Sequence, residues 1–336
     1  MAKLRTAILG CGQFAHRHAE NLLSLDSEVS LTAFCDYYVD NAINFRDQYT
    51  QGKAQIYQDY RDLIDNAALD LLVITLPPFA HKDEVALAAS KGIHLFVEKP
   101  IALSSAHAWR MVEAVESAGI KSQVGFMFRF GKAVERVKSL IDENSAGRPG
   151  LMSARYFCNA LHADWWRDKE KSGGQLVEQV IHMVDLMRYI MGEPLSVFSR
   201  QENLFHTEVP GYTNEDVSAT IYSFPKGALG VIYATNGAIP DRWINDYRLV
   251  AEKLTVEFFG ANEANLFFTD QDPIDTEMIK EDRNIHLSEM QDLIKAINTG
   301  SQTRTPIREG ALSLDMVLAA NKSAETRQEI LLKSSH

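Results

Sequence analysis

The stretch that decides the fold is 5–15, RTAILGCGQFA, near the start of a chain of 336 residues. Its first five residues form a short apolar run typical of a buried strand, and Gly10-Cys11-Gly12 follows at once. No helix breaker occurs from Phe14 to Leu23, so a helix is expected after the glycines. The stretch therefore predicts a strand, a tight turn and a helix.

The same alternation continues along the first third of the chain. Further strands are expected at 29–35, 69–75, 94–97 and 121–126, with helical segments between them. Near-continuous apolar strands joined by helices predict a parallel sheet covered on both faces. We therefore predict an α/β fold whose residues 1–123 form a doubly wound Rossmann domain that binds a dinucleotide.

The pattern changes beyond residue 123. A helix at 130–143 and a breaker cluster at 147–150 precede a strand at 151–158 and a long helix at 174–191. A last helix is expected at about 310–333, with the option of packing back on the first domain.

Strands dominate between these helices. Residues 217–224 with 228–235, and 247–251 with 254–259, are typical of antiparallel hairpins. We predict that 124–336 form an α+β domain with an open, mostly antiparallel sheet, used for substrate binding and oligomerisation.

Charge and cysteine content narrow the function classes. The net charge of −11 disfavours nucleic acid or an anionic membrane as a partner. Cys11, Cys35 and Cys158 are odd in number and match no metal-ligand spacing, so we expect neither disulfides nor a metal. The first residues lack the long apolar segment of a signal peptide, and we expect a cytoplasmic protein.

The spacing Gly10-x-Gly12-x-x-Ala15 between a strand and a helix is typical of a dinucleotide site. The glycines allow a tight turn and close approach to a pyrophosphate, which Gln13 and Phe14 would border at the helix start. The alternative is a turn that uses glycine only for its backbone conformation.

Asp36 closes the second predicted strand, at the distance where a carboxylate binds the adenosine ribose hydroxyls. Because its charge would repel a 2′-phosphate, NAD is favoured over NADP. The alternative is that Asp36 caps the next helix.

Three separated motifs resemble the glucose-fructose oxidoreductase and inositol dehydrogenase family, also called Gfo/Idh/MocA. Glu98-Lys99-Pro100 matches the most characteristic tripeptide of that family. Residues 172–185, SGGQLVEQVIHMVD, resemble its glycine-rich helix motif, with Glu178 in place of the usual Asp and Val180 in place of Gly. Residues 75–81, TLPPFAH, resemble its loop after the fourth strand.

The resemblance implies that the loop with Leu76, Pro77 and His81 lies against the nicotinamide half of the cofactor, beside Glu98. A rigid Pro-Pro turn is the alternative for this loop. The resemblance further implies that Lys99 is the proton-transfer residue.

On the predicted helix, Glu178, His182 and Asp185 project from one face. We expect His182 to share the proton transfer with Lys99, and Glu178 to orient His182. A buried hydrogen-bonded set is the alternative, and Asp185 is the first candidate for a structural role.

The resemblance also places further side chains near the substrate. Arg167 is expected to contact cofactor or an anionic group, and Arg129 either clamps a ligand or pairs with an acid. The other expected substrate contacts are Tyr156, Asn159, His162, Trp165 and Trp166, although tryptophans also fill cores.

The resemblance implies an NAD-dependent oxidoreductase for a secondary alcohol or ketone of a sugar, glycoside or cyclic polyol. Two alternatives stay open: a glycosidase that uses NAD for transient oxidation, and a regulator without catalysis on the same fold. Outward apolar residues of the second sheet favour a homodimer or homotetramer.

Overall fold

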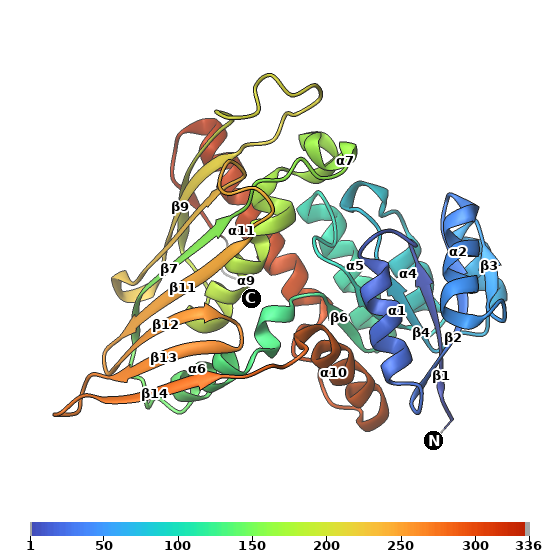
Figure 1. The fold of residues 1–336 in the computed structure, drawn as a ribbon, viewed down its shortest axis with the longest axis horizontal. Helices are drawn as coiled ribbons and strands as arrows, with labels where there is room; N and C mark the ends of the chain where they lie inside the picture. The colour runs from blue at the N-terminus through green and yellow to red at the C-terminus, as the bar shows by residue number, and fades with distance from the viewer. Residues whose placement is uncertain (1, 333–336) are drawn as a thin grey trace. The chain divides into compact units, whose positions relative to one another are not determined.

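The computed structural model describes residues 2–332, which divide into two compact units. Within the described residues, the first unit comprises 2–126 and 286–311, and the second 127–285 and 312–332. The sequence placed the division at residue 123 and assigned everything after it to the second domain. The first unit therefore includes a segment from late in the chain, shown as α10 in Figure 1.

The first unit is built on a parallel sheet of six strands in the order β3-β2-β1-β4-β5-β6. The strands are β1 Leu4–Leu9, β2 Val29–Cys35, β3 Gln55–Tyr57, β4 Leu71–Ile74, β5 His94–Val97 and β6 Ser122–Val124. The order reverses between β1 and β4, which makes this a doubly wound sheet. The predicted Rossmann domain is confirmed.

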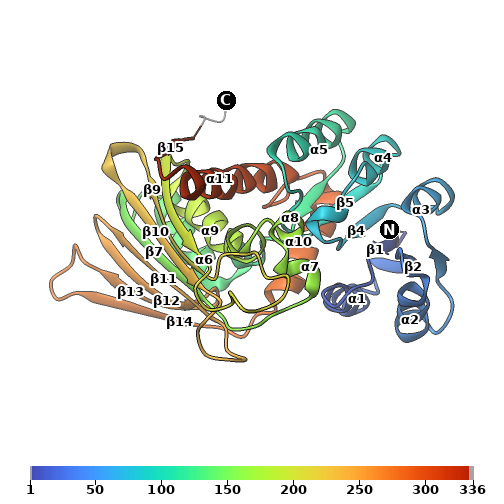
Figure 2. The same cartoon turned by 90° about the horizontal axis from the view of Figure 1, so that it is seen from above.

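Helices cover both faces of this sheet. They are α1 Ala15–Ser24, α2 Val39–Thr50, α3 Tyr60–Asn66, α4 Glu84–Ser90 and α5 Ser105–Ala118, with the short 3₁₀ turn η1 Pro78–Ala80. Figure 2 shows α1 and α2 on one face, and α3, α4 and α5 on the other. The strands are buried because apolar helix faces pack against both of their sides.

The late segment that joins the first unit is α10, Ile285–Thr299. Met290, Leu293 and Ile294 enter the same apolar core as Ile8 and Phe96 of the sheet. Further along, the carbonyl of Thr305 accepts a hydrogen bond of 2.7 Å from the amide of Val124. The segment thus completes both the core and the β6 edge of the first unit.

The second unit is built on a sheet of nine strands in the order β14-β13-β12-β11-β7-β10-β9-β8-β15. They are β7 Pro149–Phe157, β8 Ser196–Glu202, β9 Val217–Ser223, β10 Leu229–Thr235, β11 Ile244–Ala251, β12 Leu254–Gly260, β13 Glu263–Phe268, β14 Asp275–Lys280 and β15 Ile330–Leu331. Among the described strand pairs, β7 with β10 is parallel and the others are antiparallel. This confirms the predicted open, mostly antiparallel sheet and both hairpins.

The helices of the second unit lie on one face of its sheet, as Figure 2 shows for α6, α9 and α11. Their bounds are α6 Lys132–Asp142, α7 Asp164–Arg167, α8 Lys169–Ser172, α9 Ile181–Met191 and α11 Ile307–Thr326, with the 3₁₀ turns η2 Met127–Phe130 and η4 Pro225–Gly227. The last helix ends at Thr326, short of the predicted 333, and from Leu312 onward belongs to the second unit.

The predicted helix at 174–191 is two elements. A π-helical segment, η3 Leu176–Val180, precedes α9 and widens the first turns. Residues 176, 177, 179 and 180 are buried, and a π-helical turn of this kind is frequent at functional sites. In the part of the chain that the structure describes, none of the helices is long and apolar enough to span a membrane.

Candidate functional site

The carboxyl ends of five neighbouring strands form one row in the first unit. The register pairs Cys35 of β2 with Leu9 of β1, Leu9 with Ile74 of β4, Ile74 with Val97 of β5, and Val97 with Val124 of β6. The next residue along each strand is therefore, in sheet order, Asp36, Gly10, Thr75, Glu98 and Gly125. Three residues that the sequence assigned to the cofactor site, Gly10, Asp36 and Glu98, thus stand in one line.

The glycine turn after β1 has the properties of a phosphate cradle. Gly10 has φ +91°, and a Cβ there would lie 3.1 Å from the main chain of Thr75. At Gly12 a Cβ would meet no atom of the described residues within 4 Å, which leaves open space beside the main chain. The first turn of α1 carries no acidic side chain, so its positive end is available to an anion. A dinucleotide pyrophosphate therefore fits against Gly10, Gly12 and the start of α1, with Gln13 and Phe14 between Gly12 and the helix.

Asp36 is connected directly to this turn. Its Oδ2 accepts a hydrogen bond of 2.7 Å from the amide of Cys11, and its Oδ1 one of 2.8 Å from the amide of Tyr38. Tyr38 is the N-cap residue directly before α2, so the carboxylate also holds the start of the next helix, the alternative role that the sequence offered. The ribose contact stays a prediction.

The loop after β4 is held by buried polar contacts. Leu76 lies beside Gly10, where its Cδ2 is 3.2 Å from a Cβ at that position, and Pro77 leads into η1. His81 Nδ1 is 2.6 Å from Glu84 Oε1, with both side chains fully buried. Although burial raises the pKa of Glu84, the His81 contact outweighs it and lowers that pKa. His81 Nε2 is buried without a hydrogen-bond partner among residues 2–332, so it could serve a ligand.

Glu98 and Lys99 follow β5. The Glu98 carboxylate is buried, with Oε1 2.7 Å from Nε2 of His18, and its Oε2 accepts a hydrogen bond of 3.2 Å from the amide of Lys99. Burial raises the pKa of Glu98, but the hydrogen bond and charge of His18, with the charge of Lys99, hold it below its ordinary value. Sequence reasoning missed His18, which reads as an ordinary helix residue.

In the second unit, Glu178 and His182 lie on successive segments of the same helical stretch. Glu178 is in η3, and its Oε2 accepts a hydrogen bond of 2.8 Å from the indole N–H of Trp166. His182 lies in the first turn of α9 and contacts the ring of Phe128, with centroids 5.3 Å apart. That Glu178 orients His182, and that His182 meets Lys99 of the other unit, stay predictions.

Asp185 and Arg129 form a buried ion pair. Arg129 Nε and one terminal nitrogen lie 2.8 and 2.6 Å from the two carboxylate oxygens, and both side chains are 2% exposed. The hydroxyl of Ser313 donates to the same carboxylate at 2.9 Å, and Tyr189 lies under the guanidinium at 4.5 Å. Of the two roles that the sequence left open for Arg129, the geometry favours pairing with an acid.

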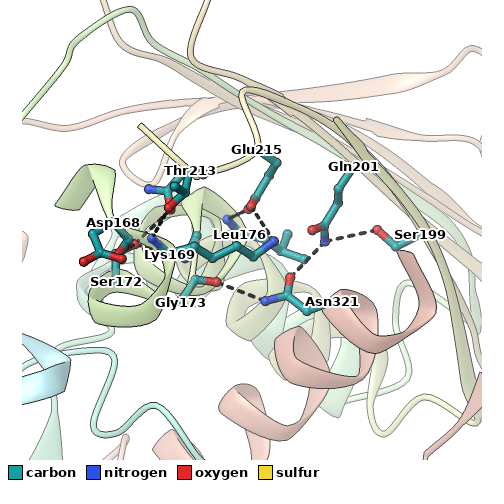
Figure 3. A network of polar contacts seen from close by, with 12 residues as sticks. Asp168, Lys169, Ser172, Gly173, Leu176, Ser199, Gln201, Thr213, Glu215 and Asn321 are labelled. Carbon is teal, nitrogen blue, oxygen red and sulfur yellow. Dashed lines mark hydrogen bonds and ion pairs between the residues drawn. The ribbon is translucent and has the colours of Figure 1, made fainter. Parts of the chain in front are cut away.

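A polar network fixes the start of this helical stretch (Figure 3). The buried Glu215 accepts a hydrogen bond of 2.7 Å from the amide of Leu176 and pairs with Lys169 at 3.1 Å. Asn321 of α11 donates to the carbonyl of Gly173 at 3.0 Å. The residues that precede Glu178 and His182 are therefore held by three segments. These are the loop before β9, which carries Glu215, and the helices α8 and α11.

An aromatic cluster, here called the aromatic wall, surrounds the loop that joins β7 to α7. It consists of His162 and Trp166, which the sequence singled out, and Trp243. His162 has φ +53°, and its ring Nε2 is 2.9 Å from the side-chain amide nitrogen, Nε2, of Gln179. Its ring lies against Trp166 at 4.4 Å and Trp243 at 6.2 Å. A non-glycine residue in this backbone region, held from several sides, is typical of a functional loop.

The remaining predicted residues border the same loop. Arg167 donates to the carbonyls of Leu161 and His162 at 2.9 and 3.1 Å, so in this structure it ties down the loop. Asn159 donates to the carbonyl of Ala238 at 2.9 Å. Tyr156 is buried on β7, which raises the pKa of its hydroxyl, and Trp165 is half-buried in α7. Ligand contacts for these residues stay predictions.

Trp243 of this wall and the neighbouring Gln179 are residues that the sequence did not single out. Trp243 is 48% exposed although it is a large apolar side chain, which suits a platform for a ligand. Gln179 lies between the two motif residues Glu178 and Val180, and its position in the motif was a usable signal. Trp243 stands alone before β11, with no motif around it.

A separate groove of about 750 Å³ opens at the other end of the first sheet. It is lined by residues such as Lys3, Leu23, Ser30, Thr50 and Gln55. These lie at or near the amino ends of β1, β2 and β3, away from the glycine turn. Since doubly wound sheets bind ligands at the carboxyl ends of their strands, we do not place the cofactor there.

Two family models match this chain. Residues 4–126 match the "oxidoreductase family, NAD-binding Rossmann fold" model of GFO_IDH_MocA, and residues 134–261 match the GFO/IDH/MocA C-terminal domain. Together they cover about three quarters of the chain and correspond to the cores of the two units.

Two curated relatives extend this similarity. The myo-inositol 2-dehydrogenase of Thermotoga maritima is 26% identical over 339 residues, covering 98% of this chain and 99% of that protein. The scyllo-inositol 2-dehydrogenase (NAD(+)) of Bacillus subtilis is 28% identical over 234 residues, covering 69% of this chain and 67% of that protein.

Among solved structures, a levoglucosan dehydrogenase in complex with NADH and L-sorbose superposes with a TM-score of 0.91. It covers 100% of both chains at 19% identity. At this identity the match supports the fold alone.

Proposed function

Because the chain belongs to the GFO/IDH/MocA oxidoreductase family, we propose that it transfers a hydride between NAD and a secondary alcohol or ketone of a cyclic polyol, sugar or glycoside. The observation that carries the proposal is the row of strand ends. Asp36, Gly10 and Glu98 stand in one line at the edge where such sheets bind ligands, and Lys99 comes directly after it.

The cofactor residues are assigned along this row. Gly10, Gly12, Gln13, Phe14 and the amino end of α1 would hold the pyrophosphate. Asp36 would bind the ribose hydroxyls and select NAD over NADP. Leu76, Pro77, His81 and Glu98 would border the nicotinamide half, and Arg167 would reach the cofactor from the second unit. When bound, NAD supplies the carbon that accepts or donates the hydride.

The chain's own residues handle the proton. We assign Lys99 as the group that accepts the hydroxyl proton during oxidation and returns it during reduction. His182 would share this role, with Glu178 orienting its ring. The proposed substrate contacts are Tyr156, Asn159, His162, Trp165 and Trp166, whereas Arg129 is assigned to the buried pair with Asp185.

The substrate class follows from the aromatic wall and from the relatives. Rings such as Trp166 and His162 suit the C–H faces of cyclic polyols and sugars, while hydroxyls need polar partners such as Asn159. The two curated relatives are named as dehydrogenases of inositols, which are cyclic polyols. We therefore place inositols first among the candidates.

The test is to incubate the purified protein with NAD and a panel of inositols, sugars and glycosides while recording the absorbance of reduced cofactor. Reduction of NAD by a member of the panel supports the proposal. Release of sugar from a glycoside without net NADH would instead identify a glycosidase that oxidises transiently. Tight NAD binding without turnover on any compound would identify a regulator.

We further propose a cytoplasmic homodimer or homotetramer. The three cysteines are unpaired and buried, which suits a reducing compartment. The face of the second sheet without helices exposes large apolar side chains, among them Leu151, Ile221, Leu229, Val250 and Phe259. A second copy of the chain would cover them. Light scattering of the purified protein tests this directly.

A further inference from the structure

The ring of His18 is fixed in place inside the first unit. His18 lies in the second turn of α1 and is 0% exposed. Its ring packs against Phe96 of β5 at 4.8 Å and against Phe14 at 5.5 Å. These contacts leave Nε2 aimed at the carboxylate of Glu98, 2.7 Å away. Because an ionised carboxylate only accepts hydrogen bonds, Nε2 carries the proton in this pair.

Glu98 fits its position only because Gly125, the residue that follows β6, has no side chain. A Cβ at Gly125 would lie 2.7 Å from Oε2 and 2.8 Å from Oε1 of Glu98. The backbone conformation of Gly125 does not require glycine, so the space for this carboxylate is the reason for it. The carboxylate is thus enclosed by α1, by the end of β6 and by the amide of Lys99.

The remaining ionisable groups around Glu98 come from α10 and α1. Glu289 is fully buried, and burial together with the negative charge of Glu98 raises its pKa well above the ordinary value, against the opposing charge of Arg17. His286 is 3.4 Å from Glu289, and burial with the charge of Arg17 lowers its pKa to about 4. The surroundings thus disfavour the charged forms of Glu289 and His286, while His18 and Lys99 favour the charged form of Glu98.

We propose that His18 is a positioning residue that acts through Glu98 on Lys99. Its imidazole N–H holds the Glu98 carboxylate, which in turn holds the amide of Lys99 and places a negative charge beside its amine. The inference rests on the proposed function insofar as Lys99 transfers the proton. Without the His18 donor, the Lys99 main chain loses its anchor and the buried Glu98 loses the interaction that most favours its charge.

Four variants separate this role from simple packing. In His18→Gln the side-chain amide nitrogen can reach the place of Nε2, whereas the shorter side chain of His18→Asn cannot. His16→Asn is the matched control, because it makes the same substitution on the same helix at a ring whose Nδ1 contacts the hydroxyl of Tyr49 at 2.6 Å, away from Glu98. Gly125→Ala displaces the same carboxylate from the other side without changing His18.

The readout is the rate at which an amine-reactive reagent labels Lys99 in the protein without cofactor or substrate, followed by mass spectrometry. A lysine whose main chain is held less firmly reacts faster. We expect His18→Asn and Gly125→Ala to raise this rate on the order of fivefold, because a segment that loses its hydrogen-bonded support opens more often to the reagent. His18→Gln and His16→Asn should stay within about twofold of the wild type, because both leave the Glu98 carboxylate held.

The proposal is overturned if His18→Asn labels at the wild-type rate, or if His18→Gln changes as much as His18→Asn. An equal change in His16→Asn would also overturn it, since the effect would then be general loosening of α1. If His18→Asn does not fold, Gly125→Ala decides, and an unchanged rate in that variant counts against the proposal.

Turnover separates this inference from the proposed function. With a substrate from the NAD panel, His18→Asn should lower kcat about tenfold, within the range of positioned proton transfer, while KM and NAD affinity stay as in the wild type. If no compound of the panel reduces NAD, the proposed function is wrong. The labelling of Lys99 would still show whether His18 positions it.

Discussion

Glu98 and Glu289 are buried carboxyl groups of the same unit whose pKa values are displaced in opposite directions. Burial acts on both, but His18 and Lys99 reverse its effect at Glu98, whereas the charge of Glu98 adds to it at Glu289. The first unit thus favours the charged form of the acid next to Lys99 and disfavours the charged form of the acid in its core.

The raised pKa of Glu289 predicts a stability penalty that depends on pH. Its pKa is higher in the folded than in the unfolded protein, so its contribution to stability is present below the unfolded value of about 4.3 and is lost as the pH rises through the folded one. Glu289→Gln should therefore be more stable than the wild type at pH 8, with the gain shrinking toward pH 4. Thermal unfolding across this range measures it, and Glu20→Gln, at an exposed position of α1, is the control. An advantage that does not change with pH would contradict the assignment.

The Arg129–Asp185 pair predicts a strong loss when one partner is removed. Both groups are 2% exposed, so Asp185 in Arg129→Met is left as a buried charge, at a cost of about 3–5 kcal/mol. Arg129→Met with Asp185→Leu should recover most of this loss. Urea denaturation of the two single variants and the double variant checks the coupling. Additive losses in the double variant would show that the pair is not a unit.

Gly174 should be intolerant of a side chain. It has φ +96°, and a Cβ there would clash with the carboxylate of Glu215, whose Oε1 accepts a hydrogen bond from the amide of Leu176. Gly211→Ala is the control, since Gly211 has φ +74° with open space around it. Strain alone costs about 1–3 kcal/mol at such positions, and Gly174→Ala should cost more than Gly211→Ala. Equal unfolding temperatures of the two variants would rule out the contact with Glu215 as a constraint.

Cofactor choice is predicted to depend on the charge of Asp36. Asp36→Asn keeps an oxygen for the amide of Cys11 or Tyr38 but removes the repulsion of a 2′-phosphate. The ratio of NADP to NAD affinity should rise about tenfold, a moderate effect for one charge. Fluorescence titration with both cofactors measures this ratio, and an unchanged ratio would assign Asp36 to the turn alone.

The sequence was sufficient to predict the elements whose residues follow one simple pattern of burial. The apolar run 71–74 and the alternating strands of the hairpins are determined by burial on two faces or on one, and both were predicted. Gly10 and Asp36 were predictable because their spacing reflects a local strand-turn-helix geometry.

Contacts between distant segments could not be predicted. Residues 285–299 form an amphipathic helix, and nothing in that pattern says that Met290 packs beside Ile8 of the first unit. The partners His18 and Glu98 are 80 positions apart, and Glu215 contacts Leu176 across 39. Such pairs follow from the register of the sheets, which a single sequence does not display.

The measurement that tests the central claim most directly is the turnover of Lys99→Met with the substrate found in the NAD panel. Loss of the proton-transfer amine should lower kcat by about 10² to 10⁴ while NAD affinity changes little. Lys91→Met, at an exposed lysine of the same unit, should retain wild-type turnover. Near-normal turnover in Lys99→Met would contradict the account.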